Sequence, residues 1–150
     1  MSSALRATPC VGICSTTYGD LVCRGCKRFA HEIVGWNTYA DEQRTRVWQR
    51  LSTLRDASTA SFLEVVDVQV LRAAADDLHL RDTASTSLLG LGYELLRRRA
   101  RDLQSLAEIG MRAIGEAHRA PVAVRDAIDA EFLLRSQAHF EHSFHIPVDQ

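Results

Sequence analysis

The chain has 150 residues, of which 46% are hydrophobic and 25% are charged, and its formal net charge is −1. This composition is typical of a globular protein with a substantial core, and the nearly neutral charge gives no overall field that would attract nucleic acid or an anionic membrane. No apolar run approaches the roughly 20 residues that span a bilayer, and the N-terminal segment lacks the apolar stretch of a secretory signal. We therefore expect a cytoplasmic protein without a membrane partner.

All four cysteines lie between positions 10 and 26. In a reducing compartment, clustered cysteines are more often metal ligands or redox thiols than disulfides. Their spacing is C-x3-C, then eight residues, then C-x2-C, and Gly25 permits the tight loop in which backbone N–H groups face sulfur. The pattern predicts a metal centre whose ligands are Cys10, Cys14, Cys23 and Cys26.

Four thiolates suit either tetrahedral Zn²⁺ or an iron–sulfur cluster. The compact loop favours zinc, and the neighbouring cations Arg24, Lys27 and Arg28 would offset the negative charge of a four-thiolate zinc site. An iron–sulfur cluster is the alternative cofactor. Two further interpretations stay open: redox chemistry by the C-x2-C pair without metal, and cysteines that are merely small buried residues.

Helical patterns follow the cysteines. A short helix is expected over residues 27–34 and ends at Gly35, a residue typical of helix C-termini. Thr38 is a typical N-cap for a second helix that runs to about Leu54, with Val47 and Leu51 on its apolar face.

Three more helices complete the prediction. The first spans residues 58–80, and Pro121 suits the first turn of the last one, which reaches about His142. Between them, an apolar stripe with steps of three and four predicts one amphipathic helix; its positions are Leu96, Ala100, Leu103, Ala107, Gly110 and Ile114. The predicted fold is all-α: a small four-cysteine metal knuckle with a short helical hairpin in residues 1–56, then a helical bundle in residues 57–150.

The N-terminal third of the chain resembles a known bacterial family. The segments that carry the likeness are Pro9–Cys14, Cys23–Arg28, Glu32-Ile33 with Trp36, and the stretch from Asp41 to Leu51. Over residues 8–55 they resemble domain-of-unknown-function family 1289, often labelled a predicted iron–sulfur protein. The resemblance implies that the four cysteines act as one unit and that Trp36 packs against it, but it implies no reaction. The chain departs from the family in Phe29 and in its long helical extension.

Other residues that can carry chemistry have simpler interpretations. The basic run of Arg97, Arg98, Arg99 and Arg101 can contact phosphates, or it can be a solvated helix face balanced by Glu94 and Asp102. His139, His142 and His145 are spaced for metal binding on one helix face, or they are a helix end that favours histidine. His31 can replace one cysteine in a site of three thiolates and one imidazole.

These observations predict a small metal-binding protein that acts as a non-enzymatic adaptor or regulatory interaction module. Its partner is expected to be another protein, bound through residues 57–150. The alternatives are an iron–sulfur redox or sensor protein, and a nucleic-acid-binding protein that uses the Arg97–Arg101 run with the basic residues at 24–28.

Overall fold

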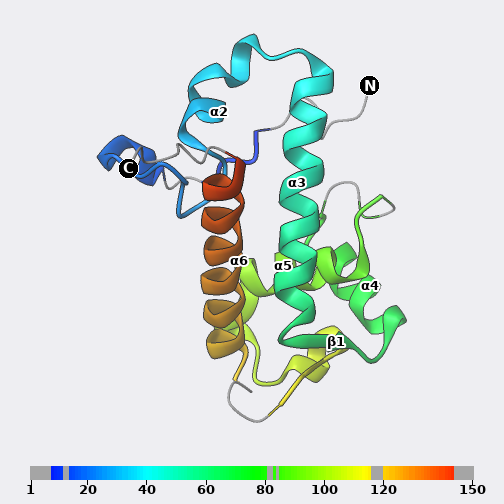
Figure 1. Cartoon of the computed structure of the whole chain (residues 1–150). Coiled ribbons are helices and arrows are strands. Elements are labelled where there is room, and N and C mark those ends of the chain that lie inside the picture. The colour runs from blue at the N-terminus through cyan, green and yellow to red at the C-terminus, as the bar shows by residue number, and fades with distance from the viewer. Residues whose placement is uncertain (1–7, 12–13, 81–82, 84, 116–119, 144–150) are drawn as a thin grey trace. The chain divides into compact units, whose positions relative to one another are not determined.

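The computed structural model describes residues 8–11, 14–80, 83, 85–115 and 120–143 (Figure 1). Its main elements in chain order are α2 (Ala30–Gly35), α3 (Asp41–Ala60), β1 (Leu63–Val65), α4 (Val68–Asp77), α5 (Leu88–Arg99), β2 (Met111–Ala113) and α6 (Pro121–Ser143). Short 3-10 turns lie at Ser15–Tyr18, Trp36–Thr38, Ala100–Asp102 and Leu106–Ile109. Within this part of the chain, no helix is both long enough and apolar enough to cross a membrane.

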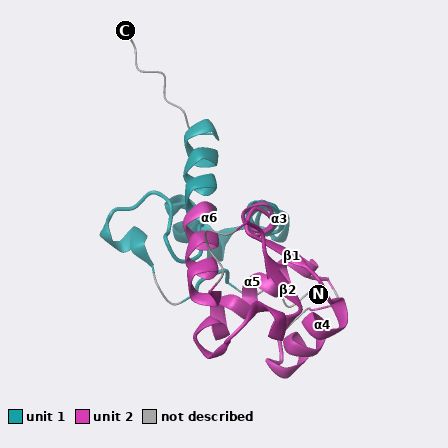
Figure 2. Cartoon of the chain, turned by 90° about the horizontal axis from the view of Figure 1, so that it is seen from below, with its two compact units in different colours: residues 1–54, 132–150 teal, residues 55–131 magenta. Residues whose placement is uncertain are grey.

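The chain forms two compact units (Figure 2). Unit 1 comprises residues 1–54 and 132–150, and unit 2 comprises residues 55–131. The boundaries fall inside helices α3 and α6, so each of these helices contributes residues to both units. The predicted division into modules 1–56 and 57–150 stays a prediction.

Helices dominate, as expected, but the all-α prediction is wrong in one element. Strands β1 and β2 pair antiparallel, with Leu63 opposite Ala113 and Val65 opposite Met111. The helix predicted over residues 58–80 is therefore replaced by the end of α3, strand β1 and the shorter helix α4. Asp67 sets the start of α4, because its carboxylate accepts hydrogen bonds from the backbone N–H groups of the first helical turn.

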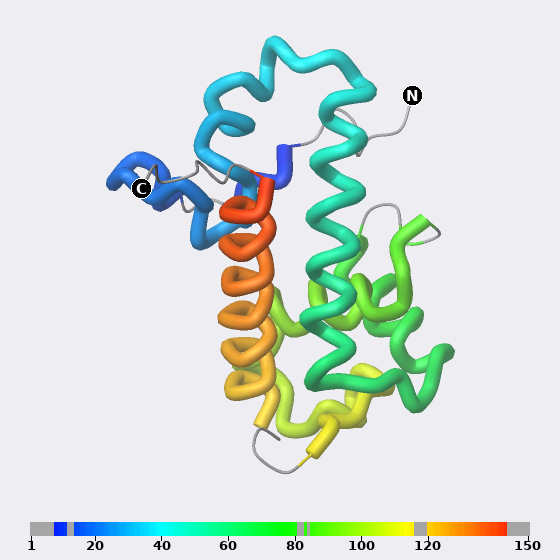
Figure 3. The backbone as a smooth tube through the Cα atoms, viewed as in Figure 1, coloured from blue at the N-terminus to red at the C-terminus, as the bar shows by residue number. Residues whose placement is uncertain are grey.

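The apolar stripe predicted as a single helix from residue 96 to residue 114 is also broken. Helix α5 ends at Arg99, and the chain then passes through two 3-10 turns into β2 (Figure 3). Gly110 has a φ of +71°, and a Cβ there would lie 2.3 Å from the carbonyl oxygen of Asp67. That carbonyl oxygen is so close because Val66 and Asp67 donate backbone hydrogen bonds to Gly110 O, at 2.8 and 3.0 Å.

Unit 2 has one apolar core formed by its helices and the two-stranded sheet. Leu71 and Leu95 are fully buried there. Gly92 allows the close approach of Met111, whose sulfur would lie 2.3 Å from a Cβ at this position. The core cluster consists of Leu63, Leu71, Ala75, Leu91, Leu95, Leu96, Ala100, Leu106, Ile109, Met111, Val124 and Ile128.

Unit 1 confirms the predicted apolar face of the second helix, since Val47 and Leu51 are buried. The predicted N-cap, Thr38, is wrong: α3 begins at Asp41, and Gln43 Oε1 accepts the backbone N–H of Ala40, the residue before it, at 2.8 Å. Helix α2 ends at Gly35, as predicted, but Gly35 is its last helical residue, with a φ of −86°, rather than a left-handed residue just beyond it. Its small size has another reason: a Cβ would lie 2.8 Å from the ring of Tyr39.

Candidate metal centre

Cys23 and Cys26 lie in a hairpin over residues 22–29, called here the cysteine hairpin. Val22 and Phe29 form an antiparallel bridge, and inside it Cys23 N donates to Arg28 O at 2.9 Å. The loop closes when Lys27 N donates to Cys23 O, also at 2.9 Å. Backbone hydrogen bonds therefore hold the two sulfur-bearing residues on one tight turn.

The thiol of Cys23 is buried and hydrogen-bonded to several neighbouring groups. The residue is 0% exposed. Burial acts to raise the pKa of its thiol, but hydrogen bonds from the backbone of Cys26, Ser15 and Gly25 and from the Cys26 thiol outweigh burial and lower the pKa to about 7. Cys23 is therefore prepared to carry negative charge inside the protein.

Cys26 has the opposite balance. Burial raises the pKa of its thiol, and the Cys23 sulfur adds to this, while Arg28 acts to lower it. Arg28 Nε donates to Cys26 Sγ at 3.3 Å, and its guanidinium lies 5.0 Å from the centre of the Trp36 ring. The expected packing of Trp36 against the cysteine unit is thus observed through Arg28.

A second buried cation lies in the same hairpin. Lys27 is 0% exposed and has a positive φ of 69°, a conformation that is unfavourable for a residue with a Cβ. Its ammonium donates to the carbonyl oxygens of Arg24 and Gly25, at 2.5 and 2.9 Å, and lies 5.4 Å from the centre of the Phe132 ring. The strained backbone at Lys27 thus places an ammonium group against the loop that joins the two cysteines.

The first cysteine pair is arranged differently. Cys14 is partly buried, with its sulfur 3.0 Å from Thr16 Oγ1, and Cys10 is exposed. The two pairs are joined through Ser15, whose side chain accepts the backbone N–H of Arg24 at 2.8 Å. None of the four cysteines forms a disulfide. In the described part of the chain, no three His, Cys, Asp or Glu side chains are gathered as a metal site.

Two of the histidine candidates, His31 and His139, contact the ring of Phe29. His139 stacks on Phe29 with 6.2 Å between ring centres and an interplanar angle of 26°, and His31 lies 5.9 Å from the same ring. His142 is exposed at the end of α6, and His145 lies outside the described residues. Within the described residues, none of them joins a group of three metal-binding side chains.

The basic run on α5 is partly neutralised. Glu94 forms ion pairs with Arg97 at 2.9 Å and with Arg98 at 3.7 Å. Arg101 is exposed in the turn that follows, whereas Arg99 is only partly so. This arrangement agrees with the solvated, balanced helix face that is the simpler interpretation of the sequence.

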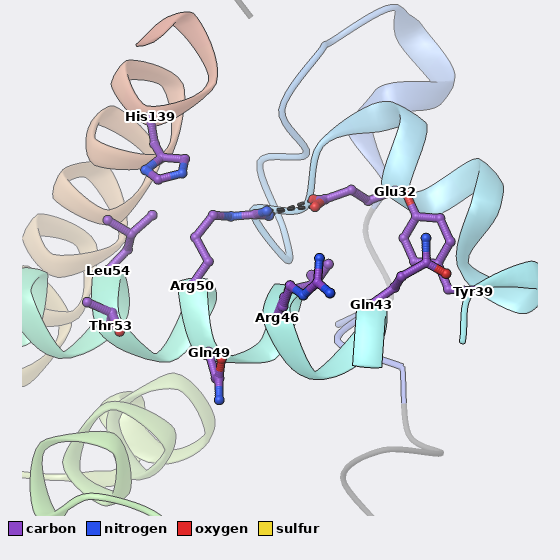
Figure 4. Close-up of a pocket in the computed structure, with 10 residues that line it drawn as sticks. Glu32, Tyr39, Gln43, Arg46, Gln49, Arg50, Thr53, Leu54 and His139 are labelled. Atoms are coloured by element: carbon purple, nitrogen blue, oxygen red, sulfur yellow. Dashed lines mark hydrogen bonds and ion pairs between the residues drawn. The ribbon is translucent and has the colours of Figure 1, made fainter. Parts of the chain in front are cut away.

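Unit 1 also contains a polar groove that sequence reasoning missed, called here the α3 groove, of about 630 Å³ (Figure 4). Its lining comes from α2, α3, the segment between them and the end of α6, and comprises Glu32, Tyr39, Gln43, Arg46, Val47, Gln49, Arg50, Thr53, Leu54 and His139. The available signal was the spacing of Gln43, Arg46 and Arg50, which places three polar residues on one side of a helix.

The N-terminal third of the chain matches a known family model. The match covers residues 8–55, and the family is described as "Protein of unknown function (DUF1289)". No curated protein and no solved structure matches the chain. The resemblance predicted from the cysteine, tryptophan and arginine pattern is therefore confirmed for residues 8–55, the segment that contains all four predicted metal ligands.

Proposed function

We propose that Cys10, Cys14, Cys23 and Cys26 bind one structural Zn²⁺, and that the protein is a non-enzymatic interaction module that docks another protein. The observation that carries this proposal is the set of backbone N–H groups directed at Cys23 Sγ. Such N–H···S hydrogen bonds stabilise the thiolate form that a metal binds. One of these donors is the backbone N–H of Ser15, the residue after Cys14. Its hydrogen bond therefore links Cys23, in the second cysteine pair, to the segment that contains the first pair.

Four cysteine thiolates are the donor set of closed structural zinc sites, and this chemistry, rather than a preformed cluster of sulfurs, supports the choice of metal. When bound, zinc links the four sulfurs and leaves no open position for chemistry. The buried cations Lys27 and Arg28 would offset the negative charge of this centre. Arg28 then connects the site to Trp36, so the cysteine hairpin and the start of the helical region are held as one body.

The burial of Cys23 argues against an enzyme or a redox thiol. A nucleophilic or redox-active cysteine must be reached by its substrate, whereas Cys23 is fully buried. Burial also weakens the nucleic-acid alternative, because Lys27 and Arg28 are buried and only Arg24 of the three neighbouring cations is exposed. An iron–sulfur cluster is the alternative occupant, since N–H···S bonds and nearby charge also set the properties of clusters.

The test is metal analysis with an absorption spectrum on protein purified with and without oxygen. We expect about one zinc per chain and no visible band; iron with sulfide and a broad visible band would assign the cluster instead. Cys23→Ser should lose the metal and disorder residues 10–36, because site formation and local folding are coupled. Arg24→Ala, an exposed change in the same loop, should keep both.

Helicity beyond residue 57 should persist in Cys23→Ser, because unit 2 has its own apolar core. Circular dichroism and amide NMR spectra of the two variants separate local from global unfolding. If Cys23→Ser stays ordered and fully metal-loaded, the four-thiolate assignment is wrong. If wild-type protein prepared under reducing conditions takes up neither zinc nor iron, the metal proposal as a whole is wrong.

A further inference from the structure

The floor of the α3 groove is a neutral, tightly bonded ion pair. Arg50 Nη1 and Nη2 donate to the two carboxylate oxygens of Glu32, at 2.6 and 2.5 Å. Phe29 N donates to the same carboxylate at 2.9 Å, and the Phe29 ring lies 4.0 Å from the guanidinium carbon of Arg50. The Glu32 carboxylate is thus fully engaged and presents little free negative charge to a ligand.

Hydrogen-bond donors line the groove beside this floor. In Figure 4, Gln43, Arg46 and Arg50 extend to the same side of α3, and Tyr39 also lines the groove. The carbonyl oxygen of the Gln43 side chain already accepts from Ala40 N, so its remaining capacity is that of the NH₂ donor. Tyrosine is protonated at neutral pH, and burial, with the nearby Glu32 carboxylate, raises the pKa of Tyr39 further, so its hydroxyl is a donor.

Arg46 supplies the uncompensated charge. It is exposed at the groove and forms no ion pair with any residue that the structure describes. Because Arg50 is neutralised by Glu32, the lining carries about one net positive charge at neutral pH. A planar guanidinium flanked by amide and hydroxyl donors matches a carboxylate, which accepts two parallel hydrogen bonds from arginine.

We infer that the α3 groove binds a carboxylate side chain from an acidic segment of a protein partner. This inference rests on the proposed role as an interaction module and names the chemistry of its partner. The groove is open to solvent rather than enclosed. A site for a free small acid buries most of its ligand, whereas an open groove suits one side chain of a larger partner whose neighbouring residues cover the rim.

The test uses the full-length protein and a fluorescently labelled hexaglutamate peptide, with hexaglutamine as the uncharged counterpart and glutarate as the free acid. We expect hexaglutamate to bind and hexaglutamine not to bind, as measured by fluorescence anisotropy at low salt. Arg46→Gln should weaken binding about tenfold, the loss of one charge-assisted contact. Arg101→Gln removes an exposed arginine of unit 2 and should leave the affinity unchanged.

Three results would overturn the inference: no binding of hexaglutamate, equal weakening by Arg46→Gln and Arg101→Gln, or binding of glutarate as tight as that of the peptide. The second result would mean nonspecific charge attraction, and the third would mean a small-acid site. Zinc content is measured on the same samples. Metal without peptide binding contradicts only the groove assignment, and peptide binding without metal contradicts only the metal proposal.

Discussion

Replacing Lys27 by methionine tests whether a buried positive charge supports the metal centre. Methionine matches the four-atom stem of the lysine side chain without its terminal ammonium and leaves the strained φ of 69° as it is, so the change isolates the ammonium. It removes two hydrogen bonds to Arg24 O and Gly25 O, of 2.5 and 2.9 Å, each contributing about 1.5–3 kcal/mol. The contact with the Phe132 ring contributes about 1 kcal/mol.

Several kcal/mol of ammonium desolvation oppose these gains. We therefore expect Lys27→Met to lower the free energy of unfolding of the metal-free protein by only about 2 kcal/mol. In the zinc-loaded protein the same change also removes a cation beside an anionic centre. The loss should be larger there, and the affinity for zinc should fall about tenfold, an additional 1.4 kcal/mol.

The assay is urea unfolding with and without zinc, combined with competition against a chelator of known affinity. Lys27→Arg retains the charge and should keep most of the zinc affinity. Equal destabilisation of both forms by Lys27→Met, with unchanged zinc affinity, would refute the electrostatic argument and leave Lys27 a purely structural role.

Two further predictions concern unit 2. Gly110→Ala should lower the free energy of unfolding by about 3 kcal/mol or more, because the residue has a φ of +71° and its Cβ would lie 2.3 Å from Asp67 O. Urea denaturation measures this loss, and a value below about 1 kcal/mol would contradict the backbone geometry. Burial, reinforced by Asp129 and Glu94, raises the pKa of the Tyr93 hydroxyl in the folded protein. The unfolded chain therefore loses the tyrosine proton at lower pH, and the free energy of unfolding falls as the pH rises above about 10, by about 1.4 kcal/mol at about pH 11. Tyr93→Phe should lose correspondingly less stability between about pH 9 and about pH 11, and an identical pH dependence in both proteins would refute this.

Local sequence signals predicted the features that depend on neighbouring residues. The C-x2-C spacing with Gly25 is sufficient to specify a sulfur-bearing turn. Pro121 correctly marks the first turn of α6, which ends at Ser143, one residue past the prediction. The apolar face of α3 is read from Val47 and Leu51 alone, because a helical period relates residues only three or four positions apart.

The features that were missed depend on contacts between distant residues. Strand β1 forms because Leu63 pairs with Ala113, which is distant in the sequence. The apolar spacing near residue 110 is also compatible with a helix, and only the close approach of the Asp67 backbone to Gly110 excludes one. The α3 groove was missed for the same reason. In the sequence, Arg46 cannot be distinguished from any other surface arginine. Its charge, unpaired among the described residues, becomes apparent only when the structure shows that Glu32 neutralises the neighbouring Arg50.

Phe29 links the two sites that we propose. It ends the cysteine hairpin through its bridge with Val22, donates its N–H to Glu32 and supplies the ring on which Arg50 rests. On its other side, Phe140 of α6 contacts it edge to face at 5.0 Å. The cysteine hairpin and the floor of the α3 groove therefore share one aromatic side chain, and a change in the order of the hairpin must alter the support of the Glu32–Arg50 pair.

The end of α6 packs on this shared residue and on Lys27. The matched segment ends at residue 55, yet unit 1 also includes residues 132–150. Phe132 lies over the Lys27 ammonium, while His139 and Phe140 cover Phe29. Without the end of α6, a lysine and an aromatic ring at the base of the cysteine hairpin would lose the side chains that pack on them. In this protein the C-terminal helix is thus a structural part of the cysteine unit, in addition to any role it has in binding a partner.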